Sequence, residues 1–347
     1  MKNYYDFVYL TNTPSFYKLN LCNRIAKKKT LLLVLYGYGS EAVNTVLTVD
    51  SKNSFDYVFI NEGDSNKRPH IKTFFRLLQL MRSIKCKKIL FSGWSAVEYN
   101  LYSLISPKEK NVIICESSIF DVSFKGIKGW IKKIVIDRMS AALPSGIPHN
   151  ELFKSIGFAG PCYNTGSVGI FNKGKRNENK QKSGNFKYLY VGRLVSVKNI
   201  QLIIEEFNEN GKPLTIVGQG ELEPELKNMA KNNISFIGFV ENEQLGAIYQ
   251  NHDVFILPST YEPWGLVVEE ALYWGLPCIV SSKVGSSIDM IKNLTTGEIF
   301  EDNNKMDLHR AIKHIENNYH MYKRNVDTIN WELRDKEQVE TYWRLIE

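Results

Sequence analysis

"DVFILPSTYEPWGLVVEEALYWGLPCIVSS", residues 253–282, holds two apolar runs of strand type on either side of a helical segment. The first run is rich in β-branched and aromatic residues, and a loop containing Pro-Trp-Gly follows it. Residues 265–275 have helical spacing and end at a glycine, and the second apolar run, 276–282, comes directly after. A short strand, a helix and another short strand predict a βαβ unit, whose two strands are parallel.

The same alternation runs through the second half of the chain. The expected strands are 186–192, 213–220, 234–240, 253–259 and 276–282, and the expected helices are 199–210, 221–232, 242–251 (with Asn242 as its N-cap) and 265–275. Repeated βαβ units predict a parallel sheet with helices on both faces. Right-handed crossovers place all the strand-to-helix loops at one edge of such a sheet, where ligands bind.

The first half has a similar but noisier pattern. Its expected strands are 6–10, 30–37, 57–61, 87–93 and 111–117, with helical stretches such as 70–83 between them. A length of 347 residues also favours two domains. We therefore expect an α/β fold of two Rossmann-like domains facing each other across a cleft.

The polar tract "FNKGKRNENKQKSGN", residues 171–185, predicts the boundary between these domains near residue 180. The predicted organisation is an N-terminal domain at 1–180, a second domain at 181–325 and a C-terminal amphipathic helix within 326–347. We expect this helix to pack back toward the N-terminal domain.

Composition narrows the class of protein. The longest purely aliphatic run, Leu31–Leu35, is far too short to span a membrane, and no signal peptide is visible at the N-terminus. The five cysteines are dispersed without a CxxC pair, which argues against a disulfide framework or a zinc site. These features predict a cytoplasmic protein.

Charge is distributed unevenly along the chain. Residues 1–182 hold 28 basic and 13 acidic side chains, a net charge of +15, and the remainder has a net charge of −8. The basic half indicates an anionic partner such as membrane lipid, a lipid-phosphate substrate or nucleic acid. Nucleic acid is disfavoured, because no aromatic stacking pattern accompanies the basic residues.

The loop at 262–265 combines features that suit a phosphate and its neighbouring sugars. A helix that begins near Gly265 offers backbone N–H groups and the positive end of its dipole to an anion. Pro263 restricts the turn, and Gly265 allows a ligand to approach the backbone. Glu262 and Glu270 flank this position and can accept hydrogen bonds from hydroxyl groups. Taken alone each is more often a solvated surface carboxylate, but together they predict a nucleotide-sugar site.

A diphosphate also needs cations. The segment "YVGRLVSVKNI", residues 190–200, supplies Arg193 and Lys198 at the same edge of the expected sheet. The sequence has no Asp-x-Asp pair, which transferases often use to bridge a diphosphate through a divalent metal. We therefore expect no metal and no cofactor. As the substrate we expect a nucleotide-sugar that is linked to UDP or GDP.

The order of these motifs resembles a known family. "VGRLVSVKN" (191–199), "IVGQGELEPEL" (216–226), "EPWGLVVEEAL" (262–272) and "TTGEIFED" (295–302) are similar to the retaining family-4 glycosyltransferases of the GT-B fold, and in particular to bacterial members that build cell-surface polysaccharides. The family usually has Phe where this chain has Trp264. The resemblance covers about 186–302 and is much weaker in the first half.

The resemblance implies a role for each matching residue. Glu262 would hold hydroxyls of the transferred sugar, and Glu270 would bind the ribose. Arg193 and Lys198 would bind the diphosphate and act with Glu262 in catalysis. The remaining donor-binding residues implied by the family are Pro263, Trp264, Gly265, Leu266, Val267, Phe239 and Val240.

The reaction implied is transfer of a sugar to a saccharide or lipid-linked saccharide with retention of anomeric configuration. Front-face attack and a covalent role for Glu262 both remain open. So do two other functions: a different GT-B enzyme, such as a sugar-nucleotide epimerase, and a non-catalytic sugar-nucleotide-binding partner.

Two features of the first half stay ambiguous. The family often carries a histidine near the donor sugar, and neither His70 nor His149 has the expected surroundings. Residues 124–143 interleave basic and apolar side chains, which fits either a helix lying on an anionic membrane or an ordinary half-buried helix. The first alternative would place the protein peripherally at the inner face of the membrane.

Overall fold

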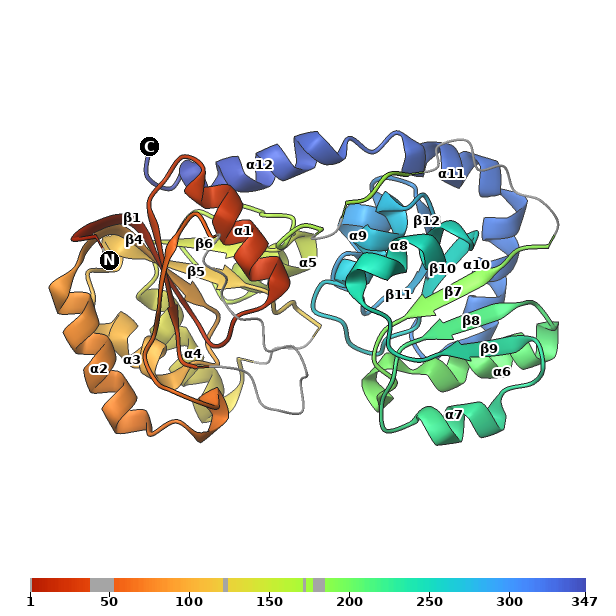
Figure 1. The fold of residues 1–347 in the computed structure, drawn as a ribbon, viewed down its shortest axis with the longest axis horizontal. Coiled ribbons are helices and arrows are strands. Elements are labelled where there is room, and N and C mark those ends of the chain that lie inside the picture. Colours follow the sequence, from red (N-terminus) through yellow and green to blue (C-terminus); the bar gives the residue numbers. More distant parts are fainter. Residues whose placement is uncertain (1, 38–52, 121–123, 171–172, 177–184) are drawn as a thin grey trace. The chain divides into compact units, whose positions relative to one another are not determined.

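The computed structural model describes residues 2–37, 53–120, 124–170, 173–176 and 185–347. The chain forms two compact units (Figure 1): unit 1 comprises Met1–Phe171 with Glu332–Glu347, and unit 2 comprises Asn172–Trp331. The boundary expected at residue 180 lies outside the described residues.

Unit 1 is built on a six-stranded parallel sheet with the order β3-β2-β1-β4-β5-β6. Its strands are β1 (Tyr4–Thr11), β2 (Leu31–Leu35), β3 (Asp56–Phe59), β4 (Lys85–Ser92), β5 (Asn111–Cys115) and β6 (Ala141–Pro144). Its helices are α1 (Phe16–Ala26), α2 (His70–Ser83), α3 (Val97–Ile105), α4 (Gly126–Asp137), α5 (Ile147–Ser155) and α12 (Trp331–Trp343), with short 3₁₀ turns η1 (Ser65–Lys67) and η2 (Lys108–Lys110). Strands β2 and β5 are buried along their whole length, as expected for a sheet covered on both faces.

The helices of unit 1 cover both faces of this sheet. Figure 1 shows α2, α3 and α4 together on one side and α1 and α12 on the other. Helix α12 is tied to the unit by Gln338 Nε2, which donates to the carbonyl of Ser167 at 2.6 Å, and by Trp343 Nε1, which donates to the carbonyl of Ile25 at 3.2 Å.

The prediction of one helix over 124–143 is wrong beyond Asp137. Helix α4 ends there, and Ala141–Pro144 forms the buried edge strand β6 instead. Parallel pairing with β5, from Val112 opposite Ala141 onward, overrides the helical propensity of the alanines.

Unit 2 repeats the same architecture with the strand order β12-β11-β10-β7-β8-β9. Its strands are β7 (Tyr188–Val191), β8 (Leu214–Val217), β9 (Ile234–Ile237), β10 (Val254–Leu257), β11 (Cys278–Ser281) and β12 (Gly297–Phe300). Its helices are α6 (Ile200–Asn210), α7 (Glu223–Met229), α8 (Asn242–Gln250), α9 (Leu266–Tyr273), α10 (Lys305–Asn317) and α11 (Tyr319–Asp327), with short helical turns η3 (Ser196–Lys198) and η4 (Ser287–Lys292). The predicted α/β fold with two Rossmann-like sheets is confirmed.

Within the described ranges, no helix is long and apolar enough to cross a membrane.

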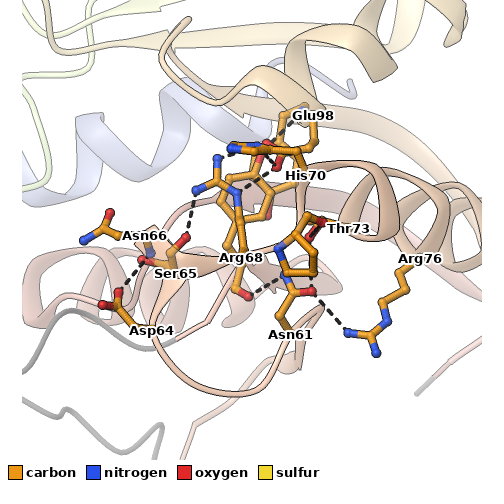
Figure 2. Close-up of polar contacts among 12 residues, drawn as sticks. Asn61, Asp64, Ser65, Asn66, Arg68, His70, Thr73, Arg76 and Glu98 are labelled. Carbon is orange, nitrogen blue, oxygen red and sulfur yellow. Dashed lines mark hydrogen bonds and ion pairs between the residues drawn. The ribbon is translucent and has the colours of Figure 1, made fainter.

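An ionic cluster around the buried carboxylate of Glu98 joins the ends of strands and helices in unit 1 (Figure 2). The guanidinium of Arg68 donates to both carboxylate oxygens of Glu98, at 2.8 and 3.0 Å, and His70 Nδ1 lies 2.8 Å from the same carboxylate. Arg68 also lies over the ring of Tyr36, with 4.0 Å to the ring centroid. Tyr36 follows β2, and Glu98 lies in the first turn of α3. The cluster therefore holds the loop after β2 against the start of α3.

The Glu98 carboxylate is stabilised in its charged form. Burial raises the pKa of Glu98, but hydrogen bonds, first of all from Arg68, outweigh that effect and lower the pKa to about 2. A carboxyl whose pKa is lowered by folding contributes stability above its unfolded-state pKa and loses it as the pH falls toward the folded-state value.

We expect Glu98→Gln to lower the free energy of unfolding at neutral pH by about 2 kcal/mol, because it leaves Arg68 buried without its ionic partner. The difference from the wild type should shrink as the pH falls from 4.5, the ordinary value for Glu, toward about 2. Denaturant unfolding at several pH values measures it. Glu62→Gln, at an exposed position, is the control and should change little; equal effects of the two substitutions would refute the role of the cluster.

Candidate functional site

The site residues expected in the second half gather where the strand order of unit 2 reverses. Strand β7 pairs with β8 on one side and with β10 on the other, so the chain leaves β7 and β10 in opposite directions. Such a switch point opens a crevice at the carboxyl edge of a parallel sheet. Arg193 and Lys198 follow β7, and Glu262 and Gly265 follow β10, so both pairs lie at this edge of the sheet.

Two loops are joined directly at this edge. The backbone N–H and the hydroxyl of Thr260 donate to the carbonyl of Val197, at 3.0 and 3.2 Å. Next to this contact, Lys198 Nζ forms an ion pair with Glu262 Oε2, and each of the two side chains is 14% exposed. An ammonium and a carboxylate therefore lie together at the mouth of the switch point.

The segment around Glu262 is held on its other side by the loop after β11. The N–H of Glu262 donates to the carbonyl of Lys283 at 3.2 Å, and the N–H of Gly285 donates back to the carbonyl of Glu262 at 2.9 Å. The N–H of Ser286 donates to the carbonyl of Trp264 at 2.9 Å. Trp264 is 3% exposed, so its ring packs into the protein and supports the loop. These backbone hydrogen bonds and the buried ring together hold the loop around Glu262 in place.

Gly265 makes the sharp entry into helix α9 possible. Its φ of +87° is one that L side chains rarely adopt, and a Cβ there would lie 3.3 Å from the Cγ of Glu262. Leu266 and Val267, the first residues of α9, are half-buried. The N-terminus of α9 therefore lies beside the side chain of Glu262. The helix begins at Leu266, directly after the Pro263-Trp264-Gly265 motif, as predicted.

Glu270 lies on α9, is 4% exposed and faces helix α8. Its carboxylate accepts hydrogen bonds from the hydroxyl of Tyr249 at 3.2 Å and from the amide of Asn242 at 3.4 Å. The prediction that Asn242 caps α8 is wrong, since Glu241 occupies the N-cap position and Asn242 turns to Glu270 instead. Tyr249 was missed, although its seven-residue spacing from Asn242 places both on one helix face.

Arg193 is exposed, and its backbone carbonyl accepts a hydrogen bond from the hydroxyl of Tyr190 at 3.0 Å. Burial and, next, the charge of Glu262 raise the pKa of Tyr190, while the charge of Arg193 lowers it. Both charged groups are therefore close enough to act on the same phenol. Phe239 and Val240 follow β9, which is separated from β7 by β8, and Phe239 is exposed.

The glycines of "GQG" allow two backbones to approach each other. A Cβ at Gly218 would lie 2.0 Å from the carbonyl oxygen of Gly192, and one at Gly220 would lie 2.3 Å from that of Leu194. These contacts hold the loop after β8 against the loop that carries Arg193. The structure therefore explains both glycines by close packing, without a ligand.

Among the described residues, no group of three His, Cys, Asp or Glu side chains could hold a metal ion. The five cysteines all lie in the described part of the chain, and none of them forms a disulfide there.

Unit 1 has a cavity of about 220 Å³ at the carboxyl edge of its own sheet. It is lined by Asn12, Lys18, Ser92, Gly93, Trp94, Ser95, Ile114, Glu116 and Ser117. His149 is fully buried beside it, with Nε2 3.1 Å from the carbonyl oxygen of Glu116. His70 instead belongs to the Glu98 cluster.

The second half of the chain matches a known protein family. Residues 172–329 match the family model described as "Glycosyl transferases group 1". The chain is 32% identical over 188 residues to an Escherichia coli protein named UDP-Gal:alpha-D-GlcNAc-diphosphoundecaprenol alpha-1,3-galactosyltransferase, covering 50% of this chain and 44% of that one. It is 29% identical over 246 residues to an uncharacterized 41.2 kDa protein in the cps region of Klebsiella pneumoniae, covering 62% of this chain and 65% of that one. The matches span less than two thirds of the length of these relatives.

Solved structures resemble the whole chain. Sucrose-phosphate synthase from Thermosynechococcus elongatus has a TM-score of 0.70 at 16% identity and covers 98% of both chains. The HepE protein of Anabaena in complex with UDP has a TM-score of 0.70 at 14% identity and covers 97% of this chain and 99% of that one. The fold is GT-B, and within the second unit residues 172–329 match the glycosyltransferase group 1 family model.

We expect Gly218→Ala to destabilise unit 2 strongly, by about 2 kcal/mol or more, because the new methyl group meets a backbone oxygen that cannot move freely. Gly211→Ala is a matched control: its φ is also positive, at +68°, but no atom lies within 4 Å of the new Cβ. This control should cost only about 1 kcal/mol of backbone strain. Thermal unfolding of both variants measures the difference, and equal costs would show that the contact with Gly192 is unimportant.

Proposed function

We propose that the protein transfers a sugar from a nucleotide-diphosphate sugar to a saccharide or lipid-linked saccharide acceptor, with retention of anomeric configuration. The observation that carries this proposal is the Lys198–Glu262 ion pair beside the N-terminus of α9 at the switch point of unit 2. This arrangement offers positive charge to a diphosphate and, next to it, a carboxylate to sugar hydroxyls.

The diphosphate would be bound by side chains and backbone together. Arg193 and Lys198 provide the cationic groups, and the backbone N–H groups from Gly265 to Val267 lie at the positive end of α9. The same cations would stabilise the negative charge that develops when the diphosphate departs. Binding of this kind does not depend on a metal ion, and we propose a metal-independent reaction.

The two glutamates would bind the two sugars of the donor. Glu262 would accept hydrogen bonds from the transferred sugar, while Glu270, oriented by Tyr249 and Asn242, would bind the ribose. The exposed ring of Phe239, with Val240, would contact the base. Trp264 and Pro263 would act by holding the loop, and Leu266 by presenting its backbone.

We propose front-face attack as the chemical step, in which the departing diphosphate accepts the proton of the attacking hydroxyl. The ion pair supports this route, because a carboxylate neutralised by an ammonium group is a weaker nucleophile than a free one. Glu262 would then orient the sugar and stabilise positive charge at its reacting carbon.

The acceptor would bind in the cavity of unit 1. Trp94 offers a ring face on which a sugar can stack, and Glu116, Asn12 and Lys18 provide polar groups around it. The name of the E. coli relative includes an acceptor sugar linked to a lipid diphosphate, and the Klebsiella relative comes from a cps region. We therefore propose a role in surface polysaccharide biosynthesis, in the cytoplasm at the inner face of the membrane.

Calorimetric titration with UDP, GDP, ADP and CMP, without added metal, tests the donor site. We expect one diphosphate to bind with micromolar affinity and Glu270→Ala to weaken it about tenfold or more, because a hydrogen-bonded carboxylate is lost. Glu243→Ala, an exposed carboxylate on α8, is the matched control and should bind like the wild type. If no nucleotide binds the wild type, the donor site is wrong.

Lys198→Met tests the catalytic role of the ion pair. We expect turnover to fall by roughly a hundredfold, because the departing diphosphate loses a positioned cation. Product analysis by NMR should show the anomeric configuration of the donor. An inverted product would contradict the mechanism, a donor altered without acceptor would favour an epimerase, and binding without transfer or hydrolysis would favour a non-catalytic partner.

A further inference from the structure

Helix α4 of unit 1 has an apolar stripe on its outward face. Ile127, Trp130 and Ile131 are 79%, 65% and 52% exposed, and the half-buried Ile134 continues the stripe. Their spacing of three and four residues places them on one side of the helix. The opposite side, with Gly129, Val135 and Ile136, is buried against the domain. The helix thus has apolar residues on two faces, and only one of these faces packs against its own domain.

Helix α3, which contacts α4, has a second outward stripe. Val97, Leu101, Leu104 and Ile105 are exposed and are again three, four or one residue apart. On the far side of α3, helix α2 adds exposed Ile71 and Phe75. Soluble domains rarely expose a contiguous apolar area across several helices unless it binds a partner. We name the outward side of α2, α3 and α4 the apolar face.

The charges on the helices that carry the apolar face are mostly positive. The basic residues of helices α2 and α4 are Lys72, Arg76, Arg82, Lys128, Lys132 and Lys133. The acidic residue of these two helices is Asp137, at the end of α4. Glu98, the acidic residue of α3, is buried in its ion pair with Arg68. Lys128 and Lys133 are exposed and lie on either side of the stripe of α4. Exposed Trp and Ile between lysines fit the interface of an anionic bilayer, where apolar side chains enter the acyl region and lysines meet the headgroups.

The apolar face also adjoins the cavity of unit 1. Trp94, which lines the cavity, packs edge-on against Phe124 with 5.7 Å between ring centroids. Phe124 is separated from the first residue of α4 by Lys125 alone. Lys132 Nζ lies 5.6 Å from the ring of Phe124 and 6.0 Å from the ring of Trp94. A bilayer against α4 would therefore bring its headgroups close to the cavity.

We propose that the apolar face docks unit 1 on an anionic membrane surface, with α4 inserted at the headgroup level, and so delivers a lipid-linked acceptor to the cavity beside Trp94. Docking follows from the apolar face alone, whereas delivery of the acceptor rests on the function proposed above. The lipid surface is preferred to a second copy of the chain, because two copies of this face would bring like charges together.

The test uses the full chain and two kinds of vesicle, phosphatidylcholine alone and phosphatidylcholine mixed with phosphatidylglycerol. We expect binding to the anionic vesicles in a sedimentation assay and much less to the neutral ones, with the difference reduced by salt. Trp130→Ser/Ile131→Ser and Lys128→Glu/Lys133→Glu should each weaken binding about tenfold or more. Tryptophan fluorescence should shift to the blue on binding, and Trp130→Phe should remove most of that shift.

Matched controls come from α10 of unit 2. Met306→Ser removes an exposed apolar side chain and Lys313→Glu reverses an exposed charge, and both should bind vesicles like the wild type. All four surface variants should keep the thermal unfolding of the wild type, because the side chains are exposed. Equal binding by the α4 variants and the wild type, or no binding of the wild type, would overturn the proposal. So would a dimer of the wild type that the α4 variants abolish.

Nucleotide titration of the same variants separates this inference from the proposed function. The α4 variants should bind the diphosphate as the wild type does, because the donor site lies in unit 2. If vesicles bind and no nucleotide does, docking stands and the transferase function fails. If the nucleotide binds and vesicles do not, the transferase function stands and docking fails.

Discussion

The pairing of β7 with β10 is the constraint on which the candidate site depends. These strands lie 60 or more residues apart in sequence, yet the register sets Val254 opposite Tyr188 and Phe255 opposite Leu189. Because both strands run the same way, their following loops emerge at one edge, where Thr260 bonds to Val197 and Lys198 meets Glu262. The ion pair is therefore a consequence of sheet topology, and a change in strand order would separate its two members.

The sheets and the residues at their carboxyl edges could be predicted from sequence, because both follow local patterns. An apolar strand that ends in glycine is recognisable within a few residues, and so is the Pro263-Trp264-Gly265 turn that precedes a helix. The strand β6 could not be predicted in this way, since Ala141–Pro144 is short and becomes a strand only by pairing with β5. Likewise, the partners of Glu270 come from a different helix, and only the packing of α8 on α9 brings Tyr249 and Asn242 to it.

Several contacts and exposed surfaces of unit 1 could not be predicted from the sequence. The bond between Arg68 and Glu98 joins residues thirty positions apart, and no motif marks either of them. The outward stripe of α3 is also invisible in sequence, because an apolar residue at helical spacing normally indicates a buried face. The side of a helix that faces the core depends on how the crossovers pack. For α3 and α4 the structure shows that apolar residues occur on both sides.

Unit 1 is discontinuous in sequence, and this shapes how the chain can fold as it is made. Residues 172–331 form a unit of one continuous segment, whereas the first unit needs the helix that begins at Trp331. Arg24 in α1 meets Asp335 at 3.2 Å and the side chain of Gln338 at 2.5 Å, and these partners leave the ribosome more than three hundred residues after it. Domains generally fold as units during synthesis. The second unit can therefore complete its fold first. The first unit can complete its fold only after its C-terminal helix, α12, has been synthesised.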